Sequence, residues 1–255
     1  MVELFIVLLI IILGFFLFML KQAAENNVLN HKVDLDGEPE QVSLFFISDV
    51  HVRKINDKML RKIGKKVDAV IIGGDFADKR TPTSRIYENI KLLKKLGPVY
   101  FVWGNNDREV GEKKLREIFK ESNVTIVEND AVLLSTLHNR CWLSAIDDTT
   151  TRNVNYQQAF KKCQGDGTII FISHNPEVFS NVRQKYDVDI MMGGHLHGGQ
   201  IRFGPFGIHP HGSFTIRDGV ATLISNGYGT TTVPLRFGAK PQCHILTLQY
   251  ERKRN

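Results

Sequence analysis

Five short apolar runs in this sequence each end beside a residue that can bind a metal ion, and this pattern constrains the fold most. The runs are SLFFIS at 43–48, DAVIIGG at 68–74, VYFVW at 99–103, TIIFIS at 168–173 and DVDIMMGG at 187–194. The residues that follow them are Asp49 with His51, Asp75, Asn105, His174, and His195 with His197. Short apolar runs of this kind are typical of strands buried on both faces. Polar groups after every one of these strands indicate that they belong to one functional site.

The stretches between the runs have helical spacing, which predicts an α/β protein. Apolar residues recur at three- and four-residue intervals in 55–66, 84–96 and 112–120. Further elements are expected as helices at 156–163 and 176–185 and as strands at 124–127, 133–137, 141–145 and 244–250. The chain beyond Gly199 is rich in glycine, threonine and β-branched residues, which favours hairpins. This alternation predicts two sheets packed face to face, with helices outside.

The residues after the strands form a set of ligands suited to metal ions. Ligand-binding sites of α/β sheets lie at the carboxyl ends of the strands, so these side chains are expected to converge. Imidazole, carboxylate and amide groups without a thiolate suit Mn, Fe or Zn, with Mn expected first. Two ions about 3.5–4 Å apart can clamp a phosphoryl group, and a carboxylate can bridge them. Asp75 is the expected bridge, because it lies between the other ligands in the sequence.

The motifs D-x-H, G-G-D, G-N-x-D, S-H and G-H-x-H occur here in that order. Together they resemble the calcineurin-like metallophosphoesterase superfamily, and GGHLHGGQ at 193–200 resembles its bacterial membrane-associated branch. The resemblance implies a four-layer α/β/β/α sandwich and a dinuclear metal centre whose activated hydroxide attacks phosphorus in line. It implies one ion held by Asp49, His51, Asp75 and His197. It implies a second ion held by Asp75, Asn105, His174 and His195.

One position departs from the family pattern. The family motif is G-N-H-[DE], whereas this chain has Gly104, Asn105, Asn106 and Asp107. Asn106 and Asp107 are the expected catalytic residues, but an asparagine cannot act as a general acid near neutral pH. Because general acid catalysis commonly contributes ~10²–10⁴ in rate, substrates with poor leaving groups are expected to turn over slowly.

The N-terminus carries an apolar segment without charge from Leu4 to Leu20. Its length is at the short end for a spanning helix, and it has no polar face for water. A signal peptide is the alternative, but the basic n-region is absent. We expect a single-pass membrane anchor at 1–21, a polar tether at 22–40 and the catalytic domain at 41–255. Lys21 and Lys32 follow the segment, so the positive-inside rule favours a cytoplasmic domain.

Charge and cysteine content exclude two other classes of protein. The net charge is +6, but the basic clusters at 61–66 and 252–254 are not interleaved with aromatic residues, so no nucleic-acid surface is expected. The three cysteines are scattered and none belongs to a CxxC motif, which argues against a disulfide framework.

The sequence therefore predicts a phosphoesterase whose substrate is a phosphate monoester, diester or pyrophosphate, with a membrane-proximal substrate suggested by the anchor. A lipid substrate would require an apolar rim, for which Phe203 and Phe206 are candidates, and Arg202 is a candidate phosphate contact. The alternatives are a scaffold of the same fold with weakened catalysis, suggested by Asn106, and a metal-binding sensor at the membrane.

Overall fold

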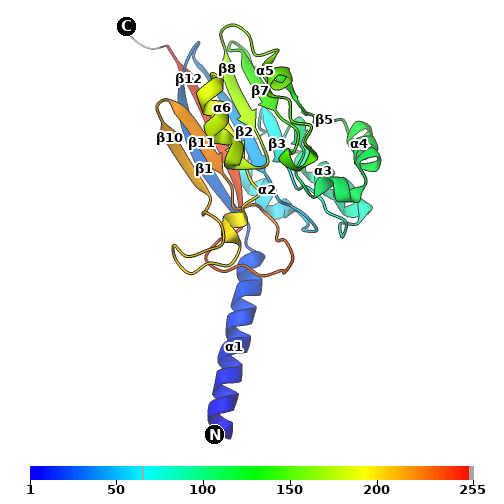
Figure 1. Cartoon of the computed structure of the whole chain (residues 1–255), viewed down its shortest axis with the longest axis vertical. Coiled ribbons are helices and arrows are strands. Elements are labelled where there is room, and N and C mark those ends of the chain that lie inside the picture. Colours follow the sequence, from blue (N-terminus) through cyan, green and yellow to red (C-terminus); the bar gives the residue numbers. More distant parts are fainter. Residues whose placement is uncertain (65, 253–255) are drawn as a thin grey trace.

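Two sheets pack face to face and carry helices on both outer surfaces (Figure 1). The computed structural model describes residues 1–64 and 66–252; parts of both basic clusters fall outside these ranges. The first sheet has the order β1-β12-β2-β3-β4-β5 and the second has the order β10-β11-β9-β8-β7-β6. The first comprises β1 (Asn27–Asp36), β2 (Glu40–Ile47), β3 (Ala69–Gly73), β4 (Val99–Val102), β5 (Val124–Ile126) and β12 (Gln242–Glu251). The second comprises β6 (Asp130–Leu133), β7 (Cys141–Ala145), β8 (Thr168–Ile172), β9 (Ile190–Gly193), β10 (Ser213–Arg217) and β11 (Val220–Ile224).

Helices cover the outer face of each sheet. Against the first sheet lie α2 (Asp57–Ile63), α3 (Thr83–Leu93) and α4 (Glu112–Glu121). Against the second lie α5 (Tyr156–Phe160) and α6 (Phe179–Lys185). The helix expected at 176–185 begins as a 3₁₀ turn, Pro176–Val178, before α6. The strand expected at 133–137 lies earlier, as β6, Asp130–Leu133, whereas the strand expected at 141–145 is β7, and the two pair antiparallel.

The side chains of β2 point alternately to the two faces of the sheet, and this explains how the layers are joined. Leu44 and Phe46 point between the sheets, where they pack with Leu143 and Ile170 of the second sheet. The alternate residue Phe45 packs instead under the helices of the first sheet. A strand buried on both faces therefore needs the continuous apolar run that the sequence contains. The prediction of an α/β/β/α sandwich is confirmed.

The expected polar tether at 22–40 is wrong, because β1 occupies most of it. Strand β1 pairs parallel with β12 over its whole length, from Asn27 beside Gln242 to Asp36 beside Glu251. Only Val33 is buried, since β1 lies at the edge of the sheet and its side chains otherwise face solvent in part. Polar side chains are usual on edge strands. Composition alone therefore does not distinguish such a strand from a tether.

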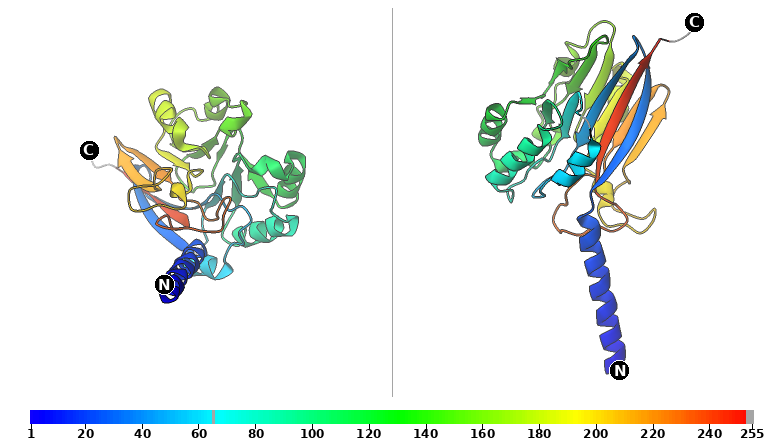
Figure 2. Two further views of the ribbon diagram at one scale, coloured as in Figure 1. Left: turned by 60° about the horizontal axis from the view of Figure 1, so that its bottom comes forward. Right: turned by 180° about the vertical axis from the view of Figure 1, so that it is seen from behind.

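Helix α1 (Val2–Ala23) projects away from the sandwich (Figures 1 and 2). It extends two residues beyond the expected anchor at 1–21, and Gln22 and Ala23 are buried against the domain. By length and composition, α1 can cross a membrane. It leads directly into β1, so the helix and the sheet are joined without a long linker.

Candidate metal centre

The proposed ligands lie in loops with an unusual backbone. Asp49, His51, Asp75, His195 and His197 all have left-handed φ angles, at 53°, 51°, 50°, 70° and 49°. This region costs a residue other than glycine roughly 1–3 kcal/mol, and it persists only where the surrounding structure enforces it. Residues strained in this way occur preferentially at functional sites. Here it directs the side chains that follow β2, β3 and β9 toward one another.

The first group of convergent ligands is Asp49, His51 and His197. The three are buried, and their ligand atoms lie within 4.8 Å of one another. His197 Nε2 lies 3.2 Å from Asp49 Oδ1 and 3.3 Å from His51 Nε2. Nitrogen and oxygen atoms this close to one another could together hold a divalent cation.

The second group is Asp49, Asp75 and His174, also buried and within the same 4.8 Å limit. His174 Nε2 lies 3.3 Å from Asp75 Oδ2 and 3.9 Å from Asp49 Oδ1. Asp75 Oδ2 in turn lies 3.8 Å from His51 Nε2, so Asp75 reaches both groups. Asp49 is common to both groups as well. The bridging role expected of Asp75 stays a prediction.

Unpartnered buried atoms support a metal at this place. Within the described residues, Asn105 Oδ1 and His174 Nε2 are buried without a hydrogen-bond partner. Buried polar atoms are normally satisfied, so each orphan requires an explanation. His174 Nδ1 lies 2.9 Å from the carbonyl oxygen of Gly73, and a proton on Nδ1 would leave Nε2 free for a metal. The residues present therefore fit divalent ions.

His195 lies beside the second group. Its ring centroid is 5.0 Å from that of His174, and it is only half-buried. Its backbone N–H donates to Asp49 Oδ1 at 3.1 Å. All of the sequence-predicted ligands thus come from loops that meet at one end of the two sheets, though His195 belongs to neither compact group.

Electrostatics at the site favour charged carboxylates. Burial by itself raises the pKa of Asp49, but the nearby imidazoles, His197 first, lower it well below the usual range. Burial lowers the pKa of His174, yet the carboxylates of Asp75 and Asp49 outweigh this and raise it to about 10. The same carboxylates would attract a metal ion, which would compete at Nε2 with the second imidazole proton.

Two glycines allow the loops to approach this closely. A Cβ on Gly74, which has a φ of 86°, would collide with the His174 ring. A Cβ on Gly194 would collide with the carboxylate of Asp49. The paired glycines of the sequence motifs therefore act as spacers at the centre of the site.

The expectation that Asp107 is catalytic is not supported by its geometry. Asp107 is fully buried, and its carboxylate accepts backbone N–H groups of Asp75 at 2.8 Å, Ala77 at 3.0 Å and Gly104 at 2.8 Å. Burial, and then the charge of Asp75, raise the pKa of Asp107 to about 7. Both oxygens are occupied in fixing the loops that carry Asp75 and Asn105. Asp107 is therefore a positioning residue.

Asn106 contacts Asp75 directly. Its backbone N–H donates to Asp75 Oδ1 at 2.8 Å, and its side-chain Nδ2 donates to Asp75 Oδ2 at 2.6 Å. The half-buried amide thus lies at the site, where the family pattern has histidine. It offers hydrogen-bond donors there without a titrating proton.

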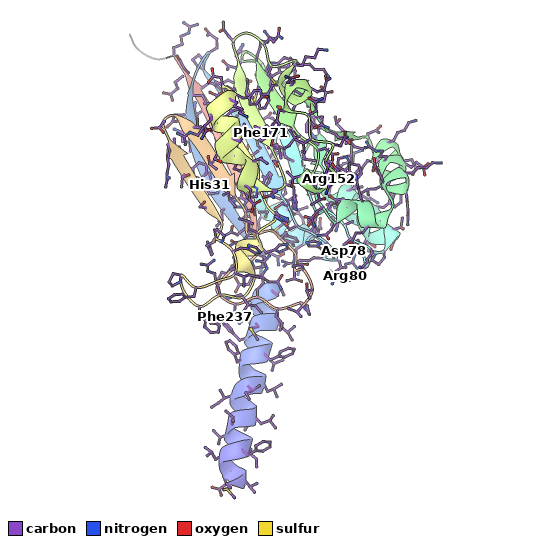
Figure 3. All side chains as sticks on the ribbon, viewed as in Figure 1. His31, Asp78, Arg80, Arg152, Phe171 and Phe237 are labelled. Atoms are coloured by element: carbon purple, nitrogen blue, oxygen red, sulfur yellow. The ribbon has the colours of Figure 1, made fainter. Side chains whose placement is uncertain are left out.

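Asp78 is a residue that sequence reasoning missed. Its Oδ2 lies 3.3 Å from His51 Nδ1, and Arg80 Nη2 pairs with the same carboxylate at 2.7 Å (Figure 3). A carboxylate on Nδ1 holds the proton there and presents Nε2 to a metal. Asp78 comes three residues after Asp75, but a single aspartate in a loop is too common for its position in the sequence to indicate a role.

Replacing Asp78 with asparagine should weaken metal binding by about tenfold, because the loss of an outer-shell carboxylate commonly costs 10–100-fold. Calorimetric titration of the metal-depleted chain with Mn²⁺ in detergent measures this change. The matched control is Asp218→Asn, which removes an exposed carboxylate paired with Arg183 in the turn between β10 and β11. Equal affinities for the two variants would contradict the role given to Asp78.

Arg236 is a second missed residue, and it is fully buried. Its guanidinium donates to the carbonyl oxygens of His197 at 3.1 Å, Ala239 at 2.8 Å and Gly229 at 2.7 Å. Nη2 also lies 3.3 Å from His197 Nδ1. Burial lowers the pKa of Arg236 to about 9. Nothing in the local sequence distinguishes this arginine from a surface one.

Arg202 and Asp148 are held by local hydrogen bonds. The Arg202 guanidinium donates to carbonyl oxygens of its own loop, those of Gly198, Gly204, Pro205 and His209, which does not support the candidate phosphate contact. Asp148 accepts the backbone N–H of Thr150 and caps a 3₁₀ turn. The cysteines Cys141, Cys163 and Cys243 are free thiols.

Residues 42–199, more than half of the chain, match the family described as calcineurin-like phosphoesterase. The chain belongs to this family. YpbG, an uncharacterized protein of Bacillus subtilis (strain 168), is 42% identical over 231 residues, which cover 89% of each chain. Phosphodiesterase YaeI of Escherichia coli (strain K12) is 26% identical over 170 residues, which cover 62% of each.

A solved structure supports the same fold. NAD nucleotidase (NadN) of Haemophilus influenzae superposes with a TM-score of 0.52 at 14% identity, over 75% of this chain and 46% of that one. At this identity the likeness concerns the fold alone. The family match and the relatives support phosphoesterase activity in general, and candidate metal-ligand groups lie within the matched residues.

Proposed function

We propose that this chain hydrolyses phosphate esters, which include monoesters, diesters and pyrophosphates, with two divalent metal ions, Mn before Fe or Zn. The proposed ligands are Asp49, His51, Asp75, Asn105, His174, His195 and His197. The observation that carries the proposal is the convergence of Asp49, Asp75 and His174 with His51 and His197 in one buried cluster. A family of phosphoesterases that bind metals is consistent with this cluster.

The chain's own residues have separate roles in this proposal. Bound metal ions supply Lewis acidity and an activated water. Asp107 fixes the loops of Asp75 and Asn105 through backbone N–H groups. Asn106 offers an amide donor at the site, while Asp78 orients His51. The loops then hold the ligands before substrate arrives, which reduces the reorganisation needed during the reaction.

We also propose that α1 is a single-pass membrane anchor. The helix is apolar along almost its whole length, and most of it projects away from the domain (Figure 1). Lys21 and Lys32 after the apolar run favour a cytoplasmic position for the domain. A membrane-proximal phosphate ester is then the expected substrate.

Hydrolysis of bis-p-nitrophenyl phosphate and p-nitrophenyl phosphate by the full chain in detergent tests the proposal. We expect turnover that Mn²⁺ restores to the metal-depleted chain and a chelator abolishes, and the ratio of the two rates separates diester from monoester preference. Absence of turnover together with absence of bound metal would reject the proposal. It would favour the alternative of a catalytically weakened scaffold, which the substitution at Asn106 motivates.

Replacing Asn106 with histidine should speed hydrolysis of an alkyl phosphate by about tenfold, a part of the ~10²–10⁴ that a well-placed general acid contributes. The p-nitrophenyl esters serve as the internal control, because their leaving group is stable as an anion and needs no proton. The rates of both substrate classes are measured in the same preparation. An unchanged alkyl-phosphate rate would mean that another group already supplies the proton.

A further inference from the structure

Four exposed apolar side chains gather at the end of the domain from which α1 projects. They are Phe203, Phe206, Ile208 and Val233, with exposed fractions of 61%, 78%, 82% and 41%. We call these four the apolar tip. They belong to the loops between β9 and β10 and between β11 and β12, which lie around the base of α1 (Figures 1 and 2). Large side chains so exposed to water, and grouped, mark a contact surface.

The apolar tip is continuous with α1 through one aromatic ring. Phe237 packs against Phe15 and Phe18 of α1, with ring centroids 5.1 and 6.2 Å apart, and against Phe203 at 4.8 Å (Figure 3). Two hydrogen bonds fix the same place: Arg236 N–H donates to the carbonyl of Met19 at 3.2 Å, and Gly238 N–H donates to Gln22 Oε1 at 2.8 Å.

These contacts set the depth of the loops relative to the bilayer. Phe15 and Phe18 belong to the uncharged run 4–20, which is the part of α1 suited to hydrocarbon. At 1.5 Å per residue this run is only ~25 Å long, less than the ~30 Å of a typical hydrocarbon core. A short span draws its flanking residues toward the membrane. Side chains packed beside Phe15 and Phe18 therefore lie at the level of the interface.

The charges of the same loops suit a lipid surface. Between Ile190 and Tyr250 the only acidic residue is Asp218. It lies in the turn between β10 and β11, at the end of the sheet opposite to α1, because β11 runs parallel to β9 toward the metal centre. The two loops that carry the apolar tip therefore contribute no carboxylate at the base of α1. Glu25, just after α1, pairs with Lys240 at 3.2 Å, so repulsion from anionic headgroups is weak there.

We propose that the apolar tip inserts into the interfacial layer of the bilayer that α1 spans. This rests on the membrane anchor proposed above. The apolar side chains then enter the boundary between headgroups and acyl chains, as in other interfacial elements. The metal centre lies at the same end of the sheets, and the residues His197 to Gln200 lead directly into the loop that carries Phe203. The metal centre therefore lies at the end of the domain that faces the lipid headgroups.

Quenching by brominated lipids tests this in the full chain reconstituted into vesicles of phosphatidylglycerol and phosphatidylcholine. The probe variants are Phe206→Trp and Ile208→Trp at the apolar tip. The matched control is Leu137→Trp, which is 85% exposed and lies beside Glu40 at the opposite end of the sheets. Ile12→Trp reports on the middle of the anchor, because residue 12 is the centre of the run 4–20. The unsubstituted chain gives the background from Trp103 and Trp142.

We expect brominated lipids to quench the added emission of both tip variants by at least about half as much as that of Ile12→Trp, as interfacial depth requires. Leu137→Trp should not be quenched. Quenching of Ile12→Trp alone would overturn the insertion of the tip while leaving the anchor in place. Lack of quenching at every position would overturn both. Tip emission shifted to the blue without quenching would indicate a protein partner, such as a second copy, and would likewise overturn the proposal.

Discussion

Replacing Asp75 with asparagine should lower metal-dependent turnover by more than ~100-fold. Replacing a residue that only hydrogen-bonds to a metal ligand already lowers metal affinity or activity by about 10–100-fold. Asp75 is the only proposed ligand expected at both ions, and its carboxylate lies 3.3 Å from His174 and 3.8 Å from His51. An amide has no net charge with which to offset two cations. The variant should still fold, because asparagine tolerates the left-handed φ of 50° at this position.

The measurement is the rate with bis-p-nitrophenyl phosphate together with the metal content after gel filtration. Asp218→Asn is the matched control, because the Asp218 side chain is 91% exposed and lies far from the ligands. We expect the control to keep full activity and full metal content. Activity retained in Asp75→Asn would contradict the proposed ligand set, whereas full metal content without activity would limit the role of Asp75 to catalysis.

The sandwich and the place of the site were predictable because both leave strong local signals. A strand such as β3, buried on both faces, has to be a short apolar run, and the residue after it is free to be polar. Asp75, His174 and the other proposed ligands are therefore recognisable at the ends of such runs. Spacing along the chain does not show how the loops meet. Only the structure therefore shows that Asp49 belongs to both groups.

Residues that act through the backbone were not predictable. Asp107 belongs to a recognisable motif, yet its role follows from three backbone N–H groups that sequence does not identify. Arg236 looks like a surface cation and is fully buried among carbonyl oxygens. The prediction of a tether at 22–40 fails for a related reason. Strand β1 is stabilised by its ladder with β12, which lies more than two hundred residues away in the sequence. A local pattern contains no record of such a distant partner.

This long-range ladder makes the region expected to be a tether essential for folding. Deletion of residues 1–37 removes β1, whereas deletion of residues 1–21 removes only the apolar part of α1. Without β1, every backbone group of β12 that faces it loses its partner, and each lost hydrogen bond costs roughly 0.5–1.5 kcal/mol. The sum over the ladder is comparable to the ~5–15 kcal/mol that stabilises a typical domain.

We therefore expect the chain 38–255 to be insoluble or to lack a cooperative thermal transition, while the chain 22–255 melts cooperatively in the same detergent. Circular dichroism at 222 nm during heating compares the two. The exposed edge of β12 also explains why aggregation is the expected fate of the shorter chain, since an unpaired strand invites pairing with other molecules. A cooperative transition in 38–255 within a few degrees of that in 22–255 would mean that β1 is an appendage after all, and that the polar segment can serve as a tether.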